Sequence, residues 1–343
     1  MNTGAPARKP QRVIPIATAP AGDAAAAAAM QRRRRAFQAG FFALFVLAPV
    51  FDLFRYDLDA DHAWLLGMEW RLGLDPFLAG QASALEAAGS IILNLFVPLL
   101  ALAALVIGAA WKWGRLYCGW LCPHFSVVES INRLMARASG KASVWDRHLL
   151  PAWKPDGRPA RVDARWWGVV VPAAVGFAFL WAVVLLTYLL PPAEVYGRLW
   201  HLDPTRNQTL FLSVATGVLT LEFLFARHLF CRFGCAVGLF QSLAWMSNRG
   251  AMVIGYARPR AADCAACYDA GGPGYAACEG VCPMRLRPRT PKHKMFACTQ
   301  CAQCVQACGT VQQAHGKVSL LKWVDRDAAR SNEAQVSLTG NRD

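Results

Sequence analysis

The sequence predicts an all-α membrane domain of about four transmembrane helices, joined to a small α+β domain. The 343 residues are 55% hydrophobic, with a mean hydropathy of +0.26, which is typical of a membrane protein with a soluble part. All 12 cysteines stand in motifs: eight within residues 264–308 and four in two C-x3-C pairs. We divide the chain into a disordered basic arm (1–35), a membrane domain (36–254), a cysteine-rich domain (255–325) and a polar tail (326–343).

The N-terminal arm is rich in Ala, Pro and Arg and ends in four arginines at residues 32–35. This composition buries too little apolar surface to fold alone. Four apolar stretches follow, each near the ~20 residues that cross a bilayer core. They are residues 36–54, 90–111, 167–190 and 209–226. The first has no small-residue cleavage pattern, so we interpret it as a retained membrane helix and not as a signal peptide.

The distribution of positive charge predicts the orientation. Lys and Arg number 7 in residues 1–35, 10 in 112–165 and 15 after 226, but only 2 in each of 55–87 and 191–208. Loops rich in Lys and Arg stay in the cytoplasm, so we expect both termini and the cysteine-rich domain there. Topology and anionic lipid thereby account for the net charge of +14, and we expect no nucleic-acid partner.

The cysteine-rich segment has the spacing of two iron–sulfur clusters. Residues 298–308 read C-x2-C-x2-C-x3-C, and residues 264–282 read C-x2-C-x10-C-x3-C with Pro283 next. In paired motifs of this kind, the fourth cysteine of each binds the other cluster. The sequence therefore predicts a two-cluster, ferredoxin-like domain. One [4Fe–4S] cluster is expected on Cys264, Cys267, Cys278 and Cys308, and the other on Cys282, Cys298, Cys301 and Cys304.

Structural zinc is the main alternative for these cysteines, but zinc ribbons space their two pairs widely. Disulfides are disfavoured on the cytoplasmic side, where thiols stay reduced. No C-x-x-C is followed by His, which excludes c-type haem attachment. The ten residues between Cys267 and Cys278 contain three glycines and a proline, and we expect a loop insertion there.

The membrane domain contains an internal repeat with a period of 113 residues. LYCGWLCPHF at 116–125 matches LFCRFGCAVG at 229–238. Residues i and i+4 share a helix face, so packing of the two repeats would bring four thiols together where the membrane meets the cytoplasm. They are Cys118, Cys122, Cys231 and Cys235. Such thiols could hold Cu(I), hold a further iron–sulfur cluster, cycle as dithiols or simply fill helix contacts.

Two histidines and a glutamate flank these thiols. His124 and His228 are candidate metal ligands, although interfacial histidines more often meet solvent or backbone. Glu222 lies near the end of the last apolar stretch. An ionisable group there is a candidate proton acceptor, unless its side chain merely extends to water.

In these motifs the chain resembles the membrane polyferredoxin-like proteins, which include the cbb3-type cytochrome oxidase accessory protein (CcoG, also called FixG) and the NapH and NosR electron-transfer proteins. The matching segments are GRLYCGWLCP at 114–123, FCRFGC with GLFQS within 230–242, and AMVIGY at 251–256. The CcoG resemblance implies reduction of Cu(II) to Cu(I) at the four membrane cysteines for oxidase assembly in the bacterial inner membrane. Ala236 stands where that family usually has Pro. We expect no immunoglobulin-like domain after residue 325.

We therefore expect a protein that moves electrons between two [4Fe–4S] clusters and the four-thiol site, from an unidentified donor. The terminal partner would be copper, cytochrome oxidase assembly proteins or a membrane quinone. The NapH and NosR resemblance implies an alternative, a quinol-linked conduit to a periplasmic reductase. A further alternative is an assembly factor that binds metal without turnover.

Overall fold

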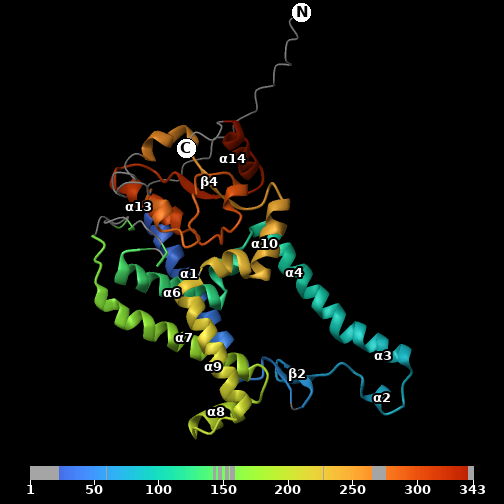
Figure 1. Ribbon diagram of the computed structural model, residues 1–343. Helices are drawn as coiled ribbons and strands as arrows, with labels where there is room; N and C mark the ends of the chain where they lie inside the picture. The colour runs from blue at the N-terminus through green and yellow to red at the C-terminus, as the bar shows by residue number, and fades with distance from the viewer. Residues whose placement is uncertain are drawn as a thin grey trace, which may run out of the picture.

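The computed structural model describes residues 23–58, 60–141, 144–145, 149–150, 154, 159–226, 228–264 and 276–338. Cys267 and most of the expected loop insertion lie outside these ranges. The helix-rich membrane part and the cysteine-rich domain occupy opposite ends of the molecule (Figure 1), with α13, β4 and α14 at the top of that view.

Three helical segments in the described part of the chain are long and apolar enough to cross a membrane. The first joins α3 (Ala84–Ile91), η1 (Ile92–Phe96) and α4 (Val97–Trp113); the second joins η2 (Ala164–Trp166) and α7 (Trp167–Thr187); the third joins α9 (Arg206–Leu221) and η3 (Glu222–Ala226). Three of the four expected spans are therefore present, because each contains the uninterrupted apolar run that a bilayer requires.

Helix α1 (Asp23–Leu47) corrects two predictions. The arm was expected to be disordered, but residues 23–35 are helical, since alanines favour a helix and Arg34 is buried by other elements. The expected span at 36–54 is not among the three candidate spans, because α1 ends at Leu47, just before Pro49. Its apolar part, residues 36–47, rises only ~18 Å, short of the ~30 Å hydrocarbon core.

The segment after α1 forms an antiparallel sheet, so the membrane part is not all-α as expected. The strands are β1 (Phe54–Asp57), β2 (His62–Leu65) and β3 (Met68–Trp70), in the order β1-β2-β3. The amide of Tyr56 donates to the carbonyl of Tyr188 at 2.9 Å, which ties the sheet to the end of α7. Figure 1 shows this sheet on the side of the molecule away from the cysteine-rich domain.

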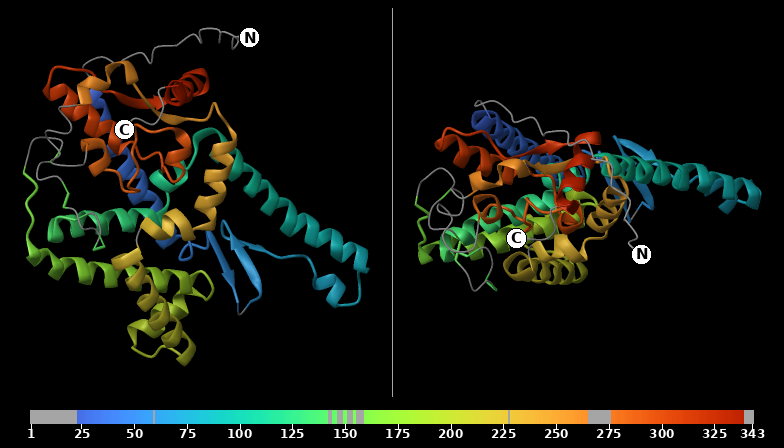
Figure 2. Two further views of the ribbon diagram at one scale, coloured as in Figure 1. Left: turned by 45° about the horizontal axis from the view of Figure 1, so that its top comes forward. Right: turned by 90° about the horizontal axis from the view of Figure 1, so that it is seen from above.

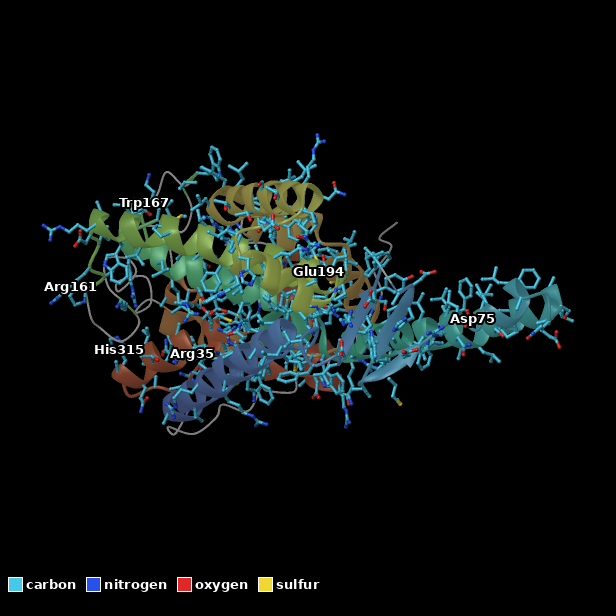
Figure 3. The ribbon with its side chains drawn as sticks, turned by 90° about the horizontal axis from the view of Figure 1, so that it is seen from below. Arg35, Asp75, Arg161, Trp167, Glu194 and His315 are labelled. Atoms are coloured by element: carbon cyan, nitrogen blue, oxygen red, sulfur yellow. The ribbon has the colours of Figure 1, made fainter. Side chains whose placement is uncertain are left out.

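The second and third spans pack together, while the first stands apart. Helix α6 (Pro123–Ser139) buries Ile131 and Met135 against Val170 and Ala174 of α7. The helix α8 (Pro192–Trp200) connects α7 to α9 at the far end. In Figures 1 and 2, α3 and α4 form a long arm that leads away from the other helices, with α2 (Asp75–Leu78) at its tip, marked by Asp75 in Figure 3.

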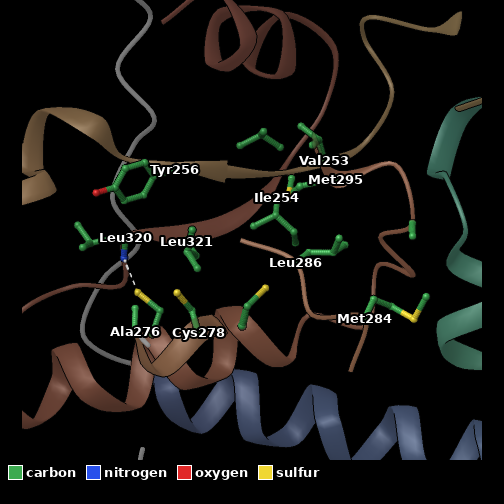
Figure 4. Packing of buried hydrophobic residues seen from close by; sticks show 14 of the residues in the cluster. Val253, Ile254, Tyr256, Ala276, Cys278, Met284, Leu286, Met295, Leu320 and Leu321 are labelled. Carbon is green, nitrogen blue, oxygen red and sulfur yellow. Dashed lines mark hydrogen bonds between the residues drawn. The ribbon is translucent and has the colours of Figure 1, made fainter. Parts of the chain in front are cut away.

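The cysteine-rich domain is built on a two-stranded antiparallel sheet, β4 (Val253–Tyr256) with β5 (Leu321–Val324). Around it lie η5 (Arg258–Cys264), α12 (Ala277–Gly280), η6 (Lys292–Met295), α13 (Gln303–Ala314) and α14 (Arg326–Leu338). Ile254, Leu286 and Leu320 are among the apolar side chains that surround Cys278 (Figure 4). Asn332 of α14 accepts the Tyr256 amide at 3.0 Å. Helix α14 therefore belongs to this domain, and the polar tail starts later than residue 326.

Candidate metal centres

Four cysteines line one apolar cavity in the cysteine-rich domain. Ile254 of β4 and Met295 of η6 are among its apolar walls. The thiols that line it are Cys282, Cys298, Cys301 and Cys304. These four cysteines are the predicted ligands of the second cluster. Cys282 is the fourth cysteine of the upstream motif, and the other three belong to the downstream motif.

Three non-glycine residues near this cavity have left-handed backbone conformations. Gln300 and Ala302 have φ of 53° and 55°, and Arg285 has φ of 54°. A non-glycine residue in this left-handed region costs roughly 1 kcal/mol or more. Alternation of right- and left-handed residues turns successive N–H groups toward one concave surface, an arrangement that recurs at iron–sulfur sites. One such amide, that of Leu286, donates to Cys282 Sγ at 3.3 Å.

The protonation of these thiols bears on the metal they suit. Burial raises the pKa of Cys282 and of Cys298 to about 12 each, so both thiols need a nearby cation to ionise at neutral pH. Within the described ranges, no three His, Cys, Asp or Glu side chains converge as a site for one metal ion. A [4Fe–4S] cluster takes four thiolate ligands, and four thiols line this cavity.

The other predicted ligand set lies in the same core, as far as the structure describes it. Cys264 ends η5, Cys278 lies in α12 and Cys308 in α13, and all three are buried. The Tyr256 hydroxyl lies 3.3 Å from Cys264 Sγ. The Leu320 amide donates to Cys308 Sγ at 3.3 Å, the dashed line in Figure 4.

The two membrane motifs share one local fold, which differs from the continuous helix expected. The first cysteine of each lies in a helical turn: Cys118 in α5 (Leu116–Trp120) and Cys231 in η4 (Phe230–Gly234). The second cysteine of each has non-helical backbone angles and caps the next helix, Cys122 before α6 and Cys235 before α10 (Ala236–Ser247). Each pair therefore spans a break between two helices.

The break does not depend on proline. Pro123 occupies the first position of α6, where its fixed φ suits a helix start, and Ala236 occupies the same position in α10. In the second motif the Cys235 side chain accepts the Gly238 amide at 3.5 Å, which caps the helix in proline's absence. Ala236 thus begins α10 after the same kind of break that precedes Pro123 in the first motif.

The structure brings the four membrane thiols close enough to influence one another. Burial raises the pKa of Cys122 to about 11, and the charges of Cys118 and Cys235 add to the increase. Burial also raises the pKa of Cys231, and Cys122 and Cys118 again add to it. The two halves of the repeat therefore lie beside each other, beyond the ends of the first and third spans.

Arg115 is buried beside these thiols. Its side chain is 1% exposed, and it donates to the carbonyl of Cys231 at 2.7 Å, while its Nε lacks a hydrogen-bond partner. No carboxylate among the described residues forms an ion pair with it. An uncompensated buried charge costs several kcal/mol. The site is therefore complementary to an anion, which a metal centre bound by several thiolates provides.

His124 links the thiols to the third span. Its Nδ1 lies 3.5 Å from Cys231 Sγ, and its Nε2 lies 3.0 Å from a carboxylate oxygen of Glu222. Glu222 opens the π-helix η3, a distortion that is frequent at functional sites. His228 is also buried, between η3 and η4. On the opposite side of the site, Cys118 lies 3.3 Å from the amide oxygen of Gln241.

Arg115 and Gln241 were not predicted from the sequence as residues of this site. A signal for Arg115 existed in the repeat: with a period of 113, position 115 corresponds to position 228, and both positions hold a basic side chain, Arg115 and His228. Gln241 gave no such signal, because its counterpart in the first repeat is Val128. Its role depends on the packing of α10 against the first motif.

Two comparisons with known proteins bear on these sites. A family model described as a 4Fe-4S binding domain matches residues 94–142 and 207–250. These segments are the two repeats of the membrane part, each with one C-x3-C motif. The Escherichia coli (strain K12) protein named "Putative electron transport protein YccM" is 25% identical over 236 residues, 67% of this chain and 56% of that protein. The chain thus spans little more than half of that relative's length. No solved structure matches.

The domain match supports an iron–sulfur protein. The relative's printed name is that of a putative electron transport protein. The three apolar helices are consistent with a bilayer environment. The domain match covers the two segments that contain the membrane thiols.

Proposed function

We propose that this protein transfers electrons between iron–sulfur centres at the cytoplasmic face of the bacterial inner membrane. Two [4Fe–4S] clusters would lie in the cysteine-rich domain, on the two ligand sets assigned above. A third centre would lie on the four membrane thiols. The observation that carries this proposal is the cavity lined by Cys282, Cys298, Cys301 and Cys304, where the Leu286 amide donates to Cys282 Sγ.

The cluster supplies the one-electron redox chemistry, and the protein determines where each centre lies and how stable each charge state is. Apolar side chains, such as Ile254 and Met295, line most of the cavity. Backbone amides donate to the ligand sulfurs, which stabilises the anionic state. At the membrane site, Arg115 supplies the compensating positive charge.

The positive-charge distribution supports the orientation in this proposal. The Asn248 side chain donates to the carbonyl of Trp111 in α4 at 3.0 Å, and Lys292 of the cysteine-rich domain donates to the carbonyl of Asn248 at 2.7 Å. The Trp111 end of the first span thus lies on the same side as the cysteine-rich domain. That side carries most of the Lys and Arg residues, as expected for the cytoplasm.

A second candidate function uses the same four thiols for copper. The resemblance to CcoG implies that one electron from the clusters would reduce Cu(II) to Cu(I), in support of cytochrome oxidase assembly. Buried thiols beside a cation favour this candidate too, because thiolates select Cu(I). A quinol could be the electron donor in either candidate function. A role as an assembly factor that binds metal without turnover would be compatible with the copper function only.

Metal analysis of protein purified without oxygen separates these candidates. Three clusters predict about twelve iron and twelve sulfide per chain, with interacting EPR signals after dithionite reduction. About eight iron together with bound copper would support the copper function. Zinc in place of iron would contradict electron transfer and leave a zinc-stabilised membrane adaptor.

A further inference from the structure

The loop of the first membrane thiol motif lies directly on the loop of the neighbouring cluster cavity. A Cβ on Gly119 would lie 2.2 Å from the carbonyl oxygen of Thr299, so only glycine permits this approach. Gly119 follows Cys118, and Thr299 follows Cys298. The contact is therefore one residue away from a thiol on each side.

A buried polar cluster surrounds this contact, and we name it the α1 clamp. Its members come from three helices: Gln31, Arg34 and Gln38 from α1, Glu129 from α6 and Gln303 from α13. The three α1 residues share one helix face, at i, i+3 and i+7. All three are buried, whereas Arg32, Arg33 and Arg35 are exposed. Arg34 is therefore the one buried residue in the run of four arginines.

On the membrane side, the α1 clamp binds Glu129 and the backbone of Gly119. Arg34 donates to both carboxylate oxygens of Glu129, at 3.0 and 2.7 Å, and to the carbonyl of Gly119 at 3.0 Å. Gln38 donates to the same carbonyl at 3.2 Å and to Glu129 at 3.1 Å. The thiol-motif loop is thereby held by two side chains of α1.

On the cluster side, the α1 clamp binds the loop that carries the cavity thiols. Gln31 donates to the carbonyl of Cys301 at 2.8 Å and accepts from Arg34 at 2.9 Å. Gln303 donates to Glu129 at 2.8 Å. In Figure 2, α1 passes beside α13 and reaches toward the membrane part. One helix thus holds both thiol loops.

The charges of the clamp act on the cluster loop. Gln31 connects Arg34 to the carbonyl of Cys301, and Gln303 connects Glu129 to the same loop. A buried ion pair is seldom more stabilising than well-packed apolar side chains of similar volume. Packing alone therefore gives no reason for charged groups at this position.

We propose that the α1 clamp controls electron exchange between the membrane thiol centre and the cluster held by Cys282, Cys298, Cys301 and Cys304. It does so by holding Gly119 against Thr299 and by placing Arg34 and Glu129 beside Cys301. Transfer of one electron would oxidise one centre and reduce the other, so no further reactant would be needed. Arg34 and Glu129 are positioning residues in this scheme. The inference rests on the proposed function.

The charge effect predicts shifts of opposite sign. Arg34→Gln leaves the carboxylate of Glu129 beside the cluster, so the midpoint potential should become more negative. Glu129→Gln leaves the guanidinium alone, so the potential should become more positive. Arg32→Gln, an exposed neighbour on the same helix, is the matched control and should cause no shift. Potentiometric titration followed by EPR measures all three.

The distance effect is tested with Gly119→Ala, whose methyl group must separate the two loops. Magnetic interaction between the two centres should weaken, while iron content stays at the wild-type value. The double variant Arg34→Met, Glu129→Leu removes both charges together and avoids a buried unpaired charge, so it should fold. It should show the same weakened interaction with little net shift in potential.

Two outcomes would overturn the inference. One is that Arg34→Gln and Glu129→Gln, each with full iron content, shift the potential in the same direction or not at all. The other is that Gly119→Ala and the double variant both retain the wild-type magnetic interaction. Failure of the proposed function is distinguishable, because the wild-type protein itself would then lack the clusters.

Discussion

Arg115 from the first thiol motif donates a 2.7 Å hydrogen bond to the carbonyl of Cys231 in the second. The two halves of the repeat thus share one buried cation. A Cβ on Gly238 would lie 2.3 Å from the guanidinium, so this glycine leaves the space that the cation occupies. The hydrogen bond from Arg115 thus joins the two C-x3-C motifs without a bound metal.

Arg115→Gln should weaken metal binding at the membrane thiols, because four thiolates and a metal centre would lose their compensating charge. We expect lower iron content and a more negative potential for this centre, measured by iron analysis and redox-monitored EPR. Arg115→Lys keeps the charge and should restore most of the potential. Arg249→Gln, on an exposed residue, is the control. Equal effects of the Lys and Gln variants would show that charge is not the determinant.

Gly238→Ala should destabilise the membrane site, since the added methyl group displaces the Arg115 side chain. Forcing an extra methyl group into a filled site costs about 1–3 kcal/mol. Gly217→Ala is the matched control, because a Cβ there meets no described atom within 4 Å and the helix should gain up to about 1 kcal/mol. Thermal unfolding in detergent compares them. A Gly238→Ala protein as stable as Gly217→Ala would contradict the crowding seen around Arg115.

Cys304→Ser and Cys118→Ser should each remove a different centre. Oxygen replaces the soft sulfur ligand in each case, so each variant should lose about four of the iron atoms per chain and the double variant about eight. Iron and sulfide analysis with EPR distinguishes the two losses. If Cys118→Ser retains all iron but loses bound copper, the four membrane thiols serve copper, as the second candidate function states.

Lys292 should make the stability depend on alkaline pH. Its Nζ donates to the carbonyls of Trp245 and Asn248 at 2.6 and 2.7 Å, and burial lowers its pKa to about 8, with Glu333 opposing this. The unfolded chain keeps the ordinary value of 10.5. Between these values the unfolded state binds more protons, so the free energy of unfolding rises with pH.

The measurement is the difference in thermal stability between the wild-type protein and Lys292→Met, followed between pH about 8 and 10.5. This difference should shift in favour of the wild type as pH rises. Lys294→Met, at an exposed position in the same short helix, should follow the wild-type profile. A flat difference across that interval would mean that Lys292 keeps its ordinary pKa.

The features predictable from the sequence were those that depend on local spacing. Cysteine spacing alone proposed the group of Cys282, Cys298, Cys301 and Cys304, and the structure gathers those thiols around one cavity. Three spans followed from apolar runs of sufficient length. The fourth expected span, 36–54, is not a continuous helix in the structure. A run of apolar residues does not reveal that the chain turns near Pro49 and enters a sheet whose strands are only three or four residues long.

The features that could not be predicted were those that depend on distant partners. Arg34 is one of four adjacent arginines, and nothing local distinguishes it from Arg33. Its burial depends on Glu129, 95 residues away in the chain. Periodicity places Gln31, Arg34 and Gln38 on one face of a helix, but a polar face ordinarily suggests exposure to solvent. The burial of this face can be predicted only if it is known that α6 and α13 cover it.

The hydrogen bond from Gln31 to Cys301 joins residues 270 positions apart, and this separation imposes an order on biosynthesis. The ribosome delivers α1 early and the cluster loop late, since domains form from the N-terminus during synthesis. Arg34 can meet Gly119 and Glu129 before the cluster loop emerges, whereas Gln31 gains its contact with Cys301 only after residue 301 has been synthesised. The two ends of the α1 clamp therefore become available at different stages of synthesis.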